Sequence, residues 1–181
     1  MDHYVIGIDV GGTNIKLGLV DKKGMIRARV HLSTKDFLYS KQGLVDAIIL
    51  GCQKILKENQ IKKSDVSGIG IGLPGLVNTK KGLVYSLTNI PGWKNVPLKK
   101  IIEKRLKIPA FIDNDVNVIT LAEWKYGAAR GMKNMVCITI GTGLGGGLII
   151  DGQLYRGEGF AAGELGHMPI NEKGRRCNCG G

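Results

Sequence analysis

Strand-like runs separated by paired glycines constrain the fold of this 181-residue chain more than any other feature of its sequence. An apolar, β-branched run at Tyr4–Val10 stops at Gly11-Gly12-Thr13, and an alternating apolar pattern resumes at Ile15–Val20. After a turn at Asp21–Gly24, Met25–Leu32 has the composition of a third strand. These short connections predict an antiparallel meander that opens a larger sheet.

Later segments alternate between helical and strand-like patterns. Apolar residues between Gln42 and Leu56 recur at helical spacing, and Val66–Leu73 is a strand-like run that ends at Pro74-Gly75. The remaining predicted elements are helices at Val96–Lys107 and Val116–Tyr126 and strands at Ala110–Ile112, Met135–Ile140 and Leu148–Ile150. This order predicts an α/β sheet covered by helices, followed by a second sheet that begins near Lys133. We expect two domains, residues 1–120 and 121–181.

Composition narrows the class of protein. With 43% hydrophobic and 23% charged residues the chain is of ordinary globular type, and no apolar run is long enough to span a bilayer. The N-terminus lacks the basic and apolar regions of a secretory signal, so we expect a cytoplasmic protein without membrane contact. The net charge of +11 is spread over both halves. One basic cluster follows Pro97, and we interpret it as a solvated helix face, the alternative being a patch for an anion or nucleic acid.

The first glycine turn, Asp9–Asn14, lies between two predicted strands. Paired glycines let a turn present backbone N–H groups to phosphate oxygens, and the side chains of Thr13 and Asn14 add donors. Asp9 ends a buried strand, where its carboxylate could bind Mg²⁺ through water. The alternative is a plain hairpin with a Gly-Gly turn.

The second glycine turn, Gly141–Gly147, contains the spacing G-x-G-x-x-G. That fingerprint should open a helix in a dinucleotide-binding fold, but Leu148–Ile150 continues as a strand, so this interpretation fails. Neither turn has the residues of a Walker A loop. Two strand–turn–strand elements, one in each domain, together predict a site for a phosphate chain.

A cluster of acids and amides at Asp113-Asn114-Asp115 ends one predicted strand and starts a helix. Asn114 or Asp115 would serve as a helix N-cap, which is the structural explanation. Phosphoryl transfer to an alcohol also needs one carboxylate to orient the hydroxyl and accept its proton, with polar neighbours to fix the substrate. Asp115 fits the first role and Asn114 the second.

Seven segments in this order resemble the ROK family of sugar kinases and repressors, most closely its bacterial glucokinases. The segments are VIGIDVGGTNIKLGLVD, GIGIGLPGLV, NIPGW, FIDNDVN, ITIGTGLGGGLIIDGQ, GEGFAAGELGHM and CNCGG. The resemblance implies the actin-like ATPase (ribonuclease H-like) fold, with a complete N-terminal domain and a partial C-terminal domain.

The resemblance also implies a role for individual residues. Asp115 matches the catalytic base that activates the sugar 6-hydroxyl. The residues that match sugar contacts are Asn114, Glu164, His167, Gly75 and Asn89. The residues that match the two phosphate loops are Gly11, Gly12, Thr13, Gly141, Thr142 and Gly143.

The same resemblance implies a structural zinc site with His167, Cys177 and Cys179 as ligands. Imidazole and thiolates suit tetrahedral Zn²⁺, and a structural site needs four protein ligands. The family's fourth ligand is a cysteine beyond Cys179, whereas this chain ends at Gly181. We therefore expect an incomplete zinc site in a truncated chain.

The implied function is ATP-dependent phosphorylation of a hexose, most simply glucose to glucose 6-phosphate, with Mg²⁺ accompanying ATP and a homodimer as the complete protein. Two alternatives remain open. One is a non-catalytic fragment, and the other is a sugar-sensing relative of ROK repressors without the helix-turn-helix that binds DNA. The sequence does not distinguish among hexoses.

Overall fold

The computed structural model describes residues 3–33, 37, 41–87, 93–141, 143–171 and 174–177. The chain forms two compact units, Met1–Asp115 and Val116–Gly181. The division falls at the start of helix α3 (Asp115–Tyr126), and the expected boundary at residue 120 lies inside that helix. None of the described helices is both long and apolar enough to cross a membrane.

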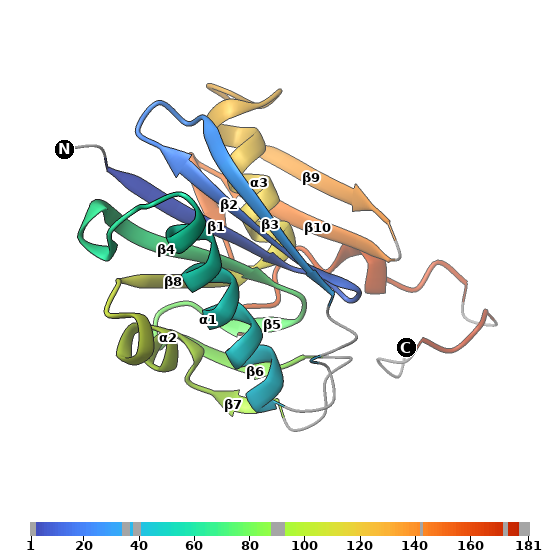
Figure 1. Cartoon of the computed structure of the whole chain (residues 1–181). Coiled ribbons are helices and arrows are strands. Elements are labelled where there is room, and N and C mark those ends of the chain that lie inside the picture. Colours follow the sequence, from blue (N-terminus) through green and yellow to red (C-terminus); the bar gives the residue numbers. More distant parts are fainter. Residues whose placement is uncertain are drawn as a thin grey trace. The chain divides into compact units, whose positions relative to one another are not determined.

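The first unit is built on a five-stranded sheet with the order β3-β2-β1-β4-β8 (Figure 1). Its strands are β1 (Tyr4–Val10), β2 (Asn14–Asp21), β3 (Ile26–Ser33), β4 (Val66–Leu73) and β8 (Ala110–Asn114). The strands β1, β2 and β3 form the predicted antiparallel meander, whereas β4 pairs in parallel with both β1 and β8. The mixed α/β prediction is confirmed for this unit.

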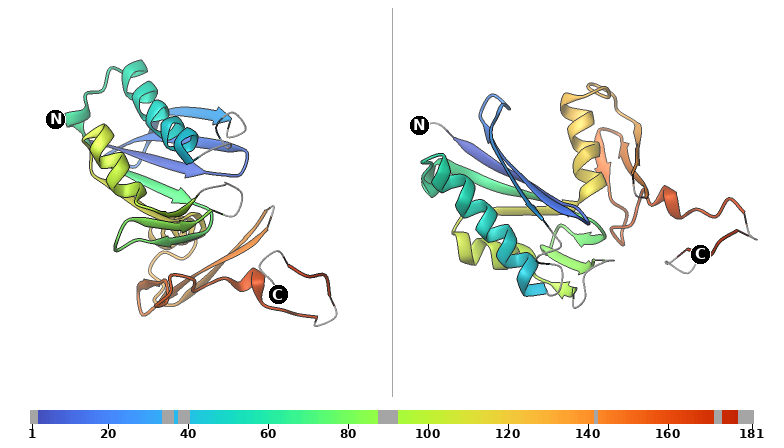
Figure 2. Two further views of the ribbon diagram at one scale, coloured as in Figure 1. Left: turned by 90° about the horizontal axis from the view of Figure 1, so that it is seen from below. Right: turned by 45° about the vertical axis from the view of Figure 1, so that its right-hand side comes forward.

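Helices α1 (Lys41–Glu58) and α2 (Leu98–Leu106) lie side by side against one face of this sheet (Figures 1 and 2). The core between these two helices and the sheet contains aliphatic side chains that are fully buried, such as Ile6, Ile48 and Ile102. Cys52 belongs to this core, and burial raises the pKa of its thiol to about 12. A buried thiol with a raised pKa is a poor nucleophile, so Cys52 serves as a core residue.

The basic cluster lies on the outer side of α2, as expected. Lys100, Lys104 and Lys107 are exposed, while Lys99 forms an ion pair with Glu103 over 3.9 Å. The helix begins at Leu98 rather than at Val96, because Val96 pairs with Val84 in a small sheet. Pro97 disfavours the helical conformation for the residue before it, which explains the later start.

That small sheet was not predicted. It contains β5 (Leu76–Asn78), β6 (Leu83–Ser86) and β7 (Lys94–Val96) in sequence order. Strands of three or four residues are too short to show an alternating pattern, so the sequence carries no periodic signal for them.

The second unit contains helix α3 and a three-stranded antiparallel sheet of order β11-β10-β9. Its strands are β9 (Met135–Ile140), β10 (Leu144–Ile150) and β11 (Gln153–Tyr155). The second sheet thus begins where expected, but β10 begins at Leu144 and not at Leu148. Gly145, Gly146 and Gly147 belong to the strand and not to the loop.

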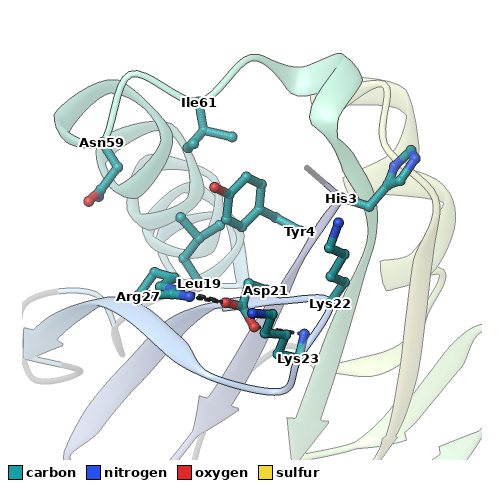
Figure 3. A pocket seen from close by; sticks show the side chains of 9 residues that line it. All are labelled: His3, Tyr4, Leu19, Asp21, Lys22, Lys23, Arg27, Asn59 and Ile61. Carbon is teal, nitrogen blue, oxygen red and sulfur yellow. Dashed lines mark hydrogen bonds and ion pairs between the residues drawn. The ribbon is translucent and has the colours of Figure 1, made fainter. Parts of the chain in front are cut away.

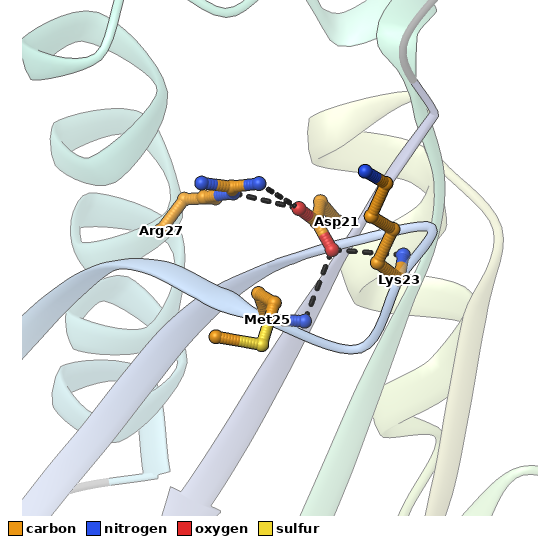
Figure 4. Close-up of polar contacts among 4 residues, drawn as sticks. All are labelled: Asp21, Lys23, Met25 and Arg27. Carbon is orange, nitrogen blue, oxygen red and sulfur yellow. Dashed lines mark hydrogen bonds and ion pairs between the residues drawn. The ribbon is translucent and has the colours of Figure 1, made fainter.

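The β2–β3 hairpin is fixed by the carboxylate of Asp21 (Figure 4). Its Oδ1 accepts hydrogen bonds from the backbone N–H groups of Lys23, at 2.8 Å, and Met25, at 3.0 Å. Its Oδ2 accepts one from Nε of Arg27 at 2.6 Å. The Met25 hydrogen bond is the main reason why the pKa of Asp21 lies below its ordinary value of 3.8, and Arg27 lowers this pKa further.

We predict that Asp21→Asn lowers the free energy of unfolding at neutral pH. The folded-state pKa of Asp21 is depressed, so its ionised form stabilises the fold above about pH 3.8, and this contribution is lost as the pH falls. The difference in the free energy of unfolding between the variant and the parent protein should therefore become smaller as the pH falls. Urea unfolding between pH 7 and pH 3 measures it, with Asp65→Asn as a control of equal charge. A difference that is constant over this range contradicts the assignment.

Candidate active site

The parallel strands of the first unit end together at one edge, which carries the predicted acidic residues. Asp9 of β1 is the register partner of Gly72 in β4, and Gly72 is the partner of Asp113 in β8. Residues paired across a sheet share a face, so two carboxylates flank a position that has no side chain. Asp9 is exposed and Asp113 is buried, with 8% of its surface accessible. Ligands in open α/β sheets bind at this end of the strands.

Two residues expected to contact sugar are in direct contact at this edge. The side-chain Nδ2 of Asn114 donates a hydrogen bond to the backbone oxygen of Gly75 at 3.1 Å. The backbone N–H of Asn114 donates to Oδ1 of Asp113 at 2.8 Å. The Asn114 side chain is therefore held across the ends of β8 and β4.

Gly75 occupies a position that excludes other residues. Its φ of +102° is a left-handed value, and a Cβ added there would lie 2.5 Å from the backbone oxygen of Ser86. A side chain would therefore displace the backbone that holds Asn114. The Pro74-Gly75 pair ends β4 and also supplies the acceptor for Asn114.

Asp115 is the first residue of α3 and follows β8 directly. At this position the carboxylate lies at a helix N-terminus, where the backbone N–H groups of the first turn carry partial positive charge. The predicted base thus lies next in the chain to the tethered Asn114. Asn89, the remaining sugar contact predicted for this unit, lies outside the described residues.

The glycine turn between β1 and β2 is tight. The backbone N–H of Gly11 donates to the oxygen of Asn14 at 2.9 Å, and Nδ2 of Asn14 donates to Oγ1 of Thr13 at 3.2 Å. The Gly11 amide is thus engaged within the turn. Gly12 and Thr13 are exposed, and within the described part of the chain their amides donate to no protein acceptor. Their two amides are the ones suited to bind an oxyanion.

The second glycine turn connects β9 and β10 in the other unit. Here the backbone N–H of Gly141 donates a hydrogen bond to the backbone oxygen of Gly143 at 3.0 Å. Thr142 lies outside the described residues. Because β10 follows as a strand, the structure agrees with the rejection of a dinucleotide-binding loop.

The next glycines serve a different purpose, which sequence analysis missed. A Cβ added at Gly145 would lie 2.6 Å from Cγ2 of Val116, and one at Gly147 would lie 2.0 Å from Oγ1 of Thr120. Both neighbours lie on α3, and Oγ1 of Thr120 donates to the backbone oxygen of Val116 at 2.7 Å. These glycines let α3 pack directly on the backbone of β10.

We predict that Gly147→Ala lowers the free energy of unfolding by about 1–3 kcal/mol, because the new methyl group overlaps Thr120. Combining it with Thr120→Ala should recover part of the loss, since the two sites are in contact. Gly141→Ala is the control, because a Cβ there has no neighbour within 4 Å. Chemical denaturation measures all four proteins. Equal effects of the two glycine substitutions would show that packing against α3 is not the reason for the glycine.

Glu164, His167 and Cys177 form a second cluster in this unit. The Nε2 atom of His167 lies 3.6 Å from Oε2 of Glu164, and its Nδ1 atom lies 3.7 Å from Sγ of Cys177. The two ring nitrogens thus face a carboxylate and a thiol. Imidazole and thiol are donors that suit zinc, but among the described residues no group of three or more potential ligands gathers around one point. Cys179 lies outside those residues.

The mixed sheet carries acidic residues where its parallel strands end, and the fold is that of the actin-like ATPases. Comparison with known proteins identifies the family. The chain matches the ROK family over residues 5–181 and belongs to it. It is 39% identical to a glucokinase of Halalkalibacterium halodurans over 184 aligned residues, covering 99% of this chain and 54% of that protein.

Solved structures give the same result. A ROK family glucokinase from Streptomyces griseus, in complex with glucose and AMPPNP, matches with a TM-score of 0.84 and 36% identity, covering 98% of this chain and 54% of that one.

The relatives that are similar in sequence also include a repressor. A xylose repressor from Caldicellulosiruptor bescii is 33% identical over 97% of this chain and 44% of the repressor. The chain spans about half the length of such relatives.

Proposed function

We propose that this chain is the part of a sugar kinase that binds the hexose and positions the base, and that the complete protein transfers phosphate from ATP to the sugar, with glucose as the preferred acceptor. The observation that carries this proposal is the contact between Asn114 and Gly75, immediately before Asp115. This contact holds the Asn114 amide at the end of the parallel strands, and Asp115 is the next residue in the chain. Similarity to glucokinases over nearly the whole chain supports it.

In the proposed reaction the sugar 6-hydroxyl oxygen attacks the γ-phosphorus of ATP. An O–P bond forms, the bond from phosphorus to the bridging oxygen breaks, and ADP leaves. The carboxylate of Asp115 accepts the hydroxyl proton, and Asn114 holds a neighbouring hydroxyl. Positioning and charge stabilisation carry most of the catalysis in such transfers, so the rigid tether of Asn114 matters as much as the base.

The glycine turns would bind phosphate. In the first unit the amides of Gly12 and Thr13 would donate to a phosphate oxygen, and in the second unit the glycine turn that includes Gly141 and Gly143 would do the same. Mg²⁺, when bound with ATP, offsets the charge of the phosphates. The exposed carboxylate of Asp9 has the oxygen donors that this cation prefers and would hold it through water.

His167 has a double role in this proposal. Its Nε2 faces Glu164, which we assign to the sugar, and its Nδ1 faces Cys177, which we assign with Cys179 to a structural zinc ion. A metal at Nδ1 would fix the ring orientation and so the position of Nε2. The fourth ligand would come from the remainder of the protein.

A second candidate is a sugar-sensing regulator, since xylose repressors are 33% identical over this chain. The two candidates differ in turnover. A kinase releases ADP in the presence of hexose and ATP, whereas a sensor binds the sugar without consuming ATP.

We predict that Asp115→Asn in the complete protein lowers kcat at least about 100-fold, because the proton acceptor is lost. Glucose affinity should change only a few-fold, since the amide keeps the shape of the side chain. A coupled ADP assay and calorimetry measure the two quantities, with Asp65→Asn as a control that should retain parental activity. If Asp115→Asn keeps near-normal kcat, Asp115 is not the base.

A further inference from the structure

Residues 76–112, which cross the middle of the chain, carry a strong excess of positive charge. This segment contains eight basic residues and one acidic residue, Glu103. Its net charge is therefore +7, while that of the whole chain is +11. The segment comprises β5, β6, β7 and α2 and ends within β8, so its charge belongs to the first unit.

The fold brings lysines from three of these elements together. The backbone N–H of Lys99 donates to the backbone oxygen of Gly82 at 3.3 Å, and a Cβ added at Gly82 would lie 2.5 Å from Cβ of Lys99. The turn between β5 and β6 thus lies against the first turn of α2, and β7 leads directly into this helix. The exposed lysines of these elements form what we call the basic surface, namely Lys80, Lys81, Lys94, Lys100, Lys104 and Lys107.

The charges of the basic surface are not neutralised by neighbouring acids. Glu103 pairs with Lys99 over 3.9 Å and also accepts the backbone N–H of Ala110 at 3.1 Å. Arg105 is paired with Asp46 of α1. Among the described residues, no carboxylate forms an ion pair with a lysine of the basic surface. Their charges therefore add to a positive potential over this face of the unit.

An exposed aromatic side chain, Phe111, borders the basic surface. It lies on β8, the edge strand of the five-stranded sheet, and 64% of its surface is accessible. The Nζ atom of Lys99 lies 5.5 Å from the centroid of its ring. Lysines that can contact phosphates and an aromatic ring on which a base can stack are the two groups that bind single-stranded nucleic acids.

Other polyanions use these features less well. The apolar side of α2, with Leu98, Ile102 and Leu106, is buried in the core and has nothing to insert into a bilayer. A nucleic acid duplex keeps the faces of its bases stacked inside the helix, so Phe111 would find no base to contact. An unpaired strand presents both its phosphates and its bases.

We propose that the basic surface and Phe111 bind single-stranded nucleic acid without sequence preference. The phosphates lie along the lysines, and one base stacks on the Phe111 ring. This inference is independent of the function proposed for the strand edge.

Fluorescence anisotropy of a labelled oligothymidylate of about 15 nucleotides, titrated with the full chain, tests the proposal. The affinity should fall steeply as the salt concentration rises, because phosphate contacts release counterions. An abasic strand of the same length carries the same phosphates without bases. It should bind at least about fivefold more weakly, since it cannot stack.

Two variants separate the two kinds of contact. Lys104→Glu should weaken oligothymidylate binding about tenfold and make it less dependent on salt, because a phosphate contact is lost. Phe111→Ala should weaken it at least about fivefold, with unchanged salt dependence and unchanged affinity for the abasic strand.

Lys23→Glu is the matched control for charge. Lys23 lies in the turn between β2 and β3, the two strands furthest from β8 in the sheet order. With Tyr4 and residues of two further segments it lines a cavity of about 520 Å³ where β1 begins (Figure 3). Its replacement should leave the affinity for oligothymidylate within about twofold.

Equal losses in Lys104→Glu and Lys23→Glu overturn the proposal, because they would indicate only the general charge of the protein. Equal affinity for the abasic strand, or no effect of Phe111→Ala, also overturns it. Cosedimentation with vesicles of phosphatidylserine and phosphatidylcholine should show no greater loss in Lys104→Glu and Phe111→Ala than in Lys23→Glu. A greater loss would assign the surface to a membrane instead.

Discussion

The parallel pairing of β1, β4 and β8 is the constraint on which the candidate site depends. Its register places Asp9, Gly72 and Asp113 in one row and makes the three strands end at a common edge. Backbone hydrogen bonds set this register, and a shift by one residue would turn the polar row to the buried face. The aliphatic core beneath α1 and α2 prevents such a shift, because the isoleucines of these strands fill it.

Glycines have several distinct structural roles in this chain. Gly75 adopts a left-handed conformation next to another backbone and presents the oxygen that holds Asn114. Gly147 gives α3 room to pack on β10. Gly51 faces Leu17 closely and lets α1 approach the sheet of the first unit. The glycines that we propose to bind phosphate lie in two short turns, at Gly11-Gly12 and at Gly141–Gly143.

The main elements of both units were predictable, because they are long enough to show a hydrophobic period. The meander, α1, β4 and α3 were found within one or two residues of their observed ends. The small sheet of β5, β6 and β7 was missed, since such short strands depend on tertiary pairing. Gly145–Gly147 were misassigned to a loop, because a strand without side chains has no pattern to detect.

Sequence motifs propose the residues of the candidate site, but the contacts between these residues come from the structure alone. The motifs around Gly75 and Asn114 are individually weak, and only the sheet shows that they meet. The cavity beside Tyr4 had no sequence signal at all. Its lining combines ordinary surface residue types from three segments, which only the fold brings together.

A crystal structure of the complete protein with glucose and a non-hydrolysable ATP analogue tests the central claim most directly. The account predicts a carboxylate oxygen of Asp115 within hydrogen-bonding distance, about 2.6–3.2 Å, of the 6-hydroxyl oxygen, with the Asn114–Gly75 hydrogen bond intact. A sugar bound elsewhere, or an Asp115 side chain turned away from every sugar hydroxyl, would contradict it.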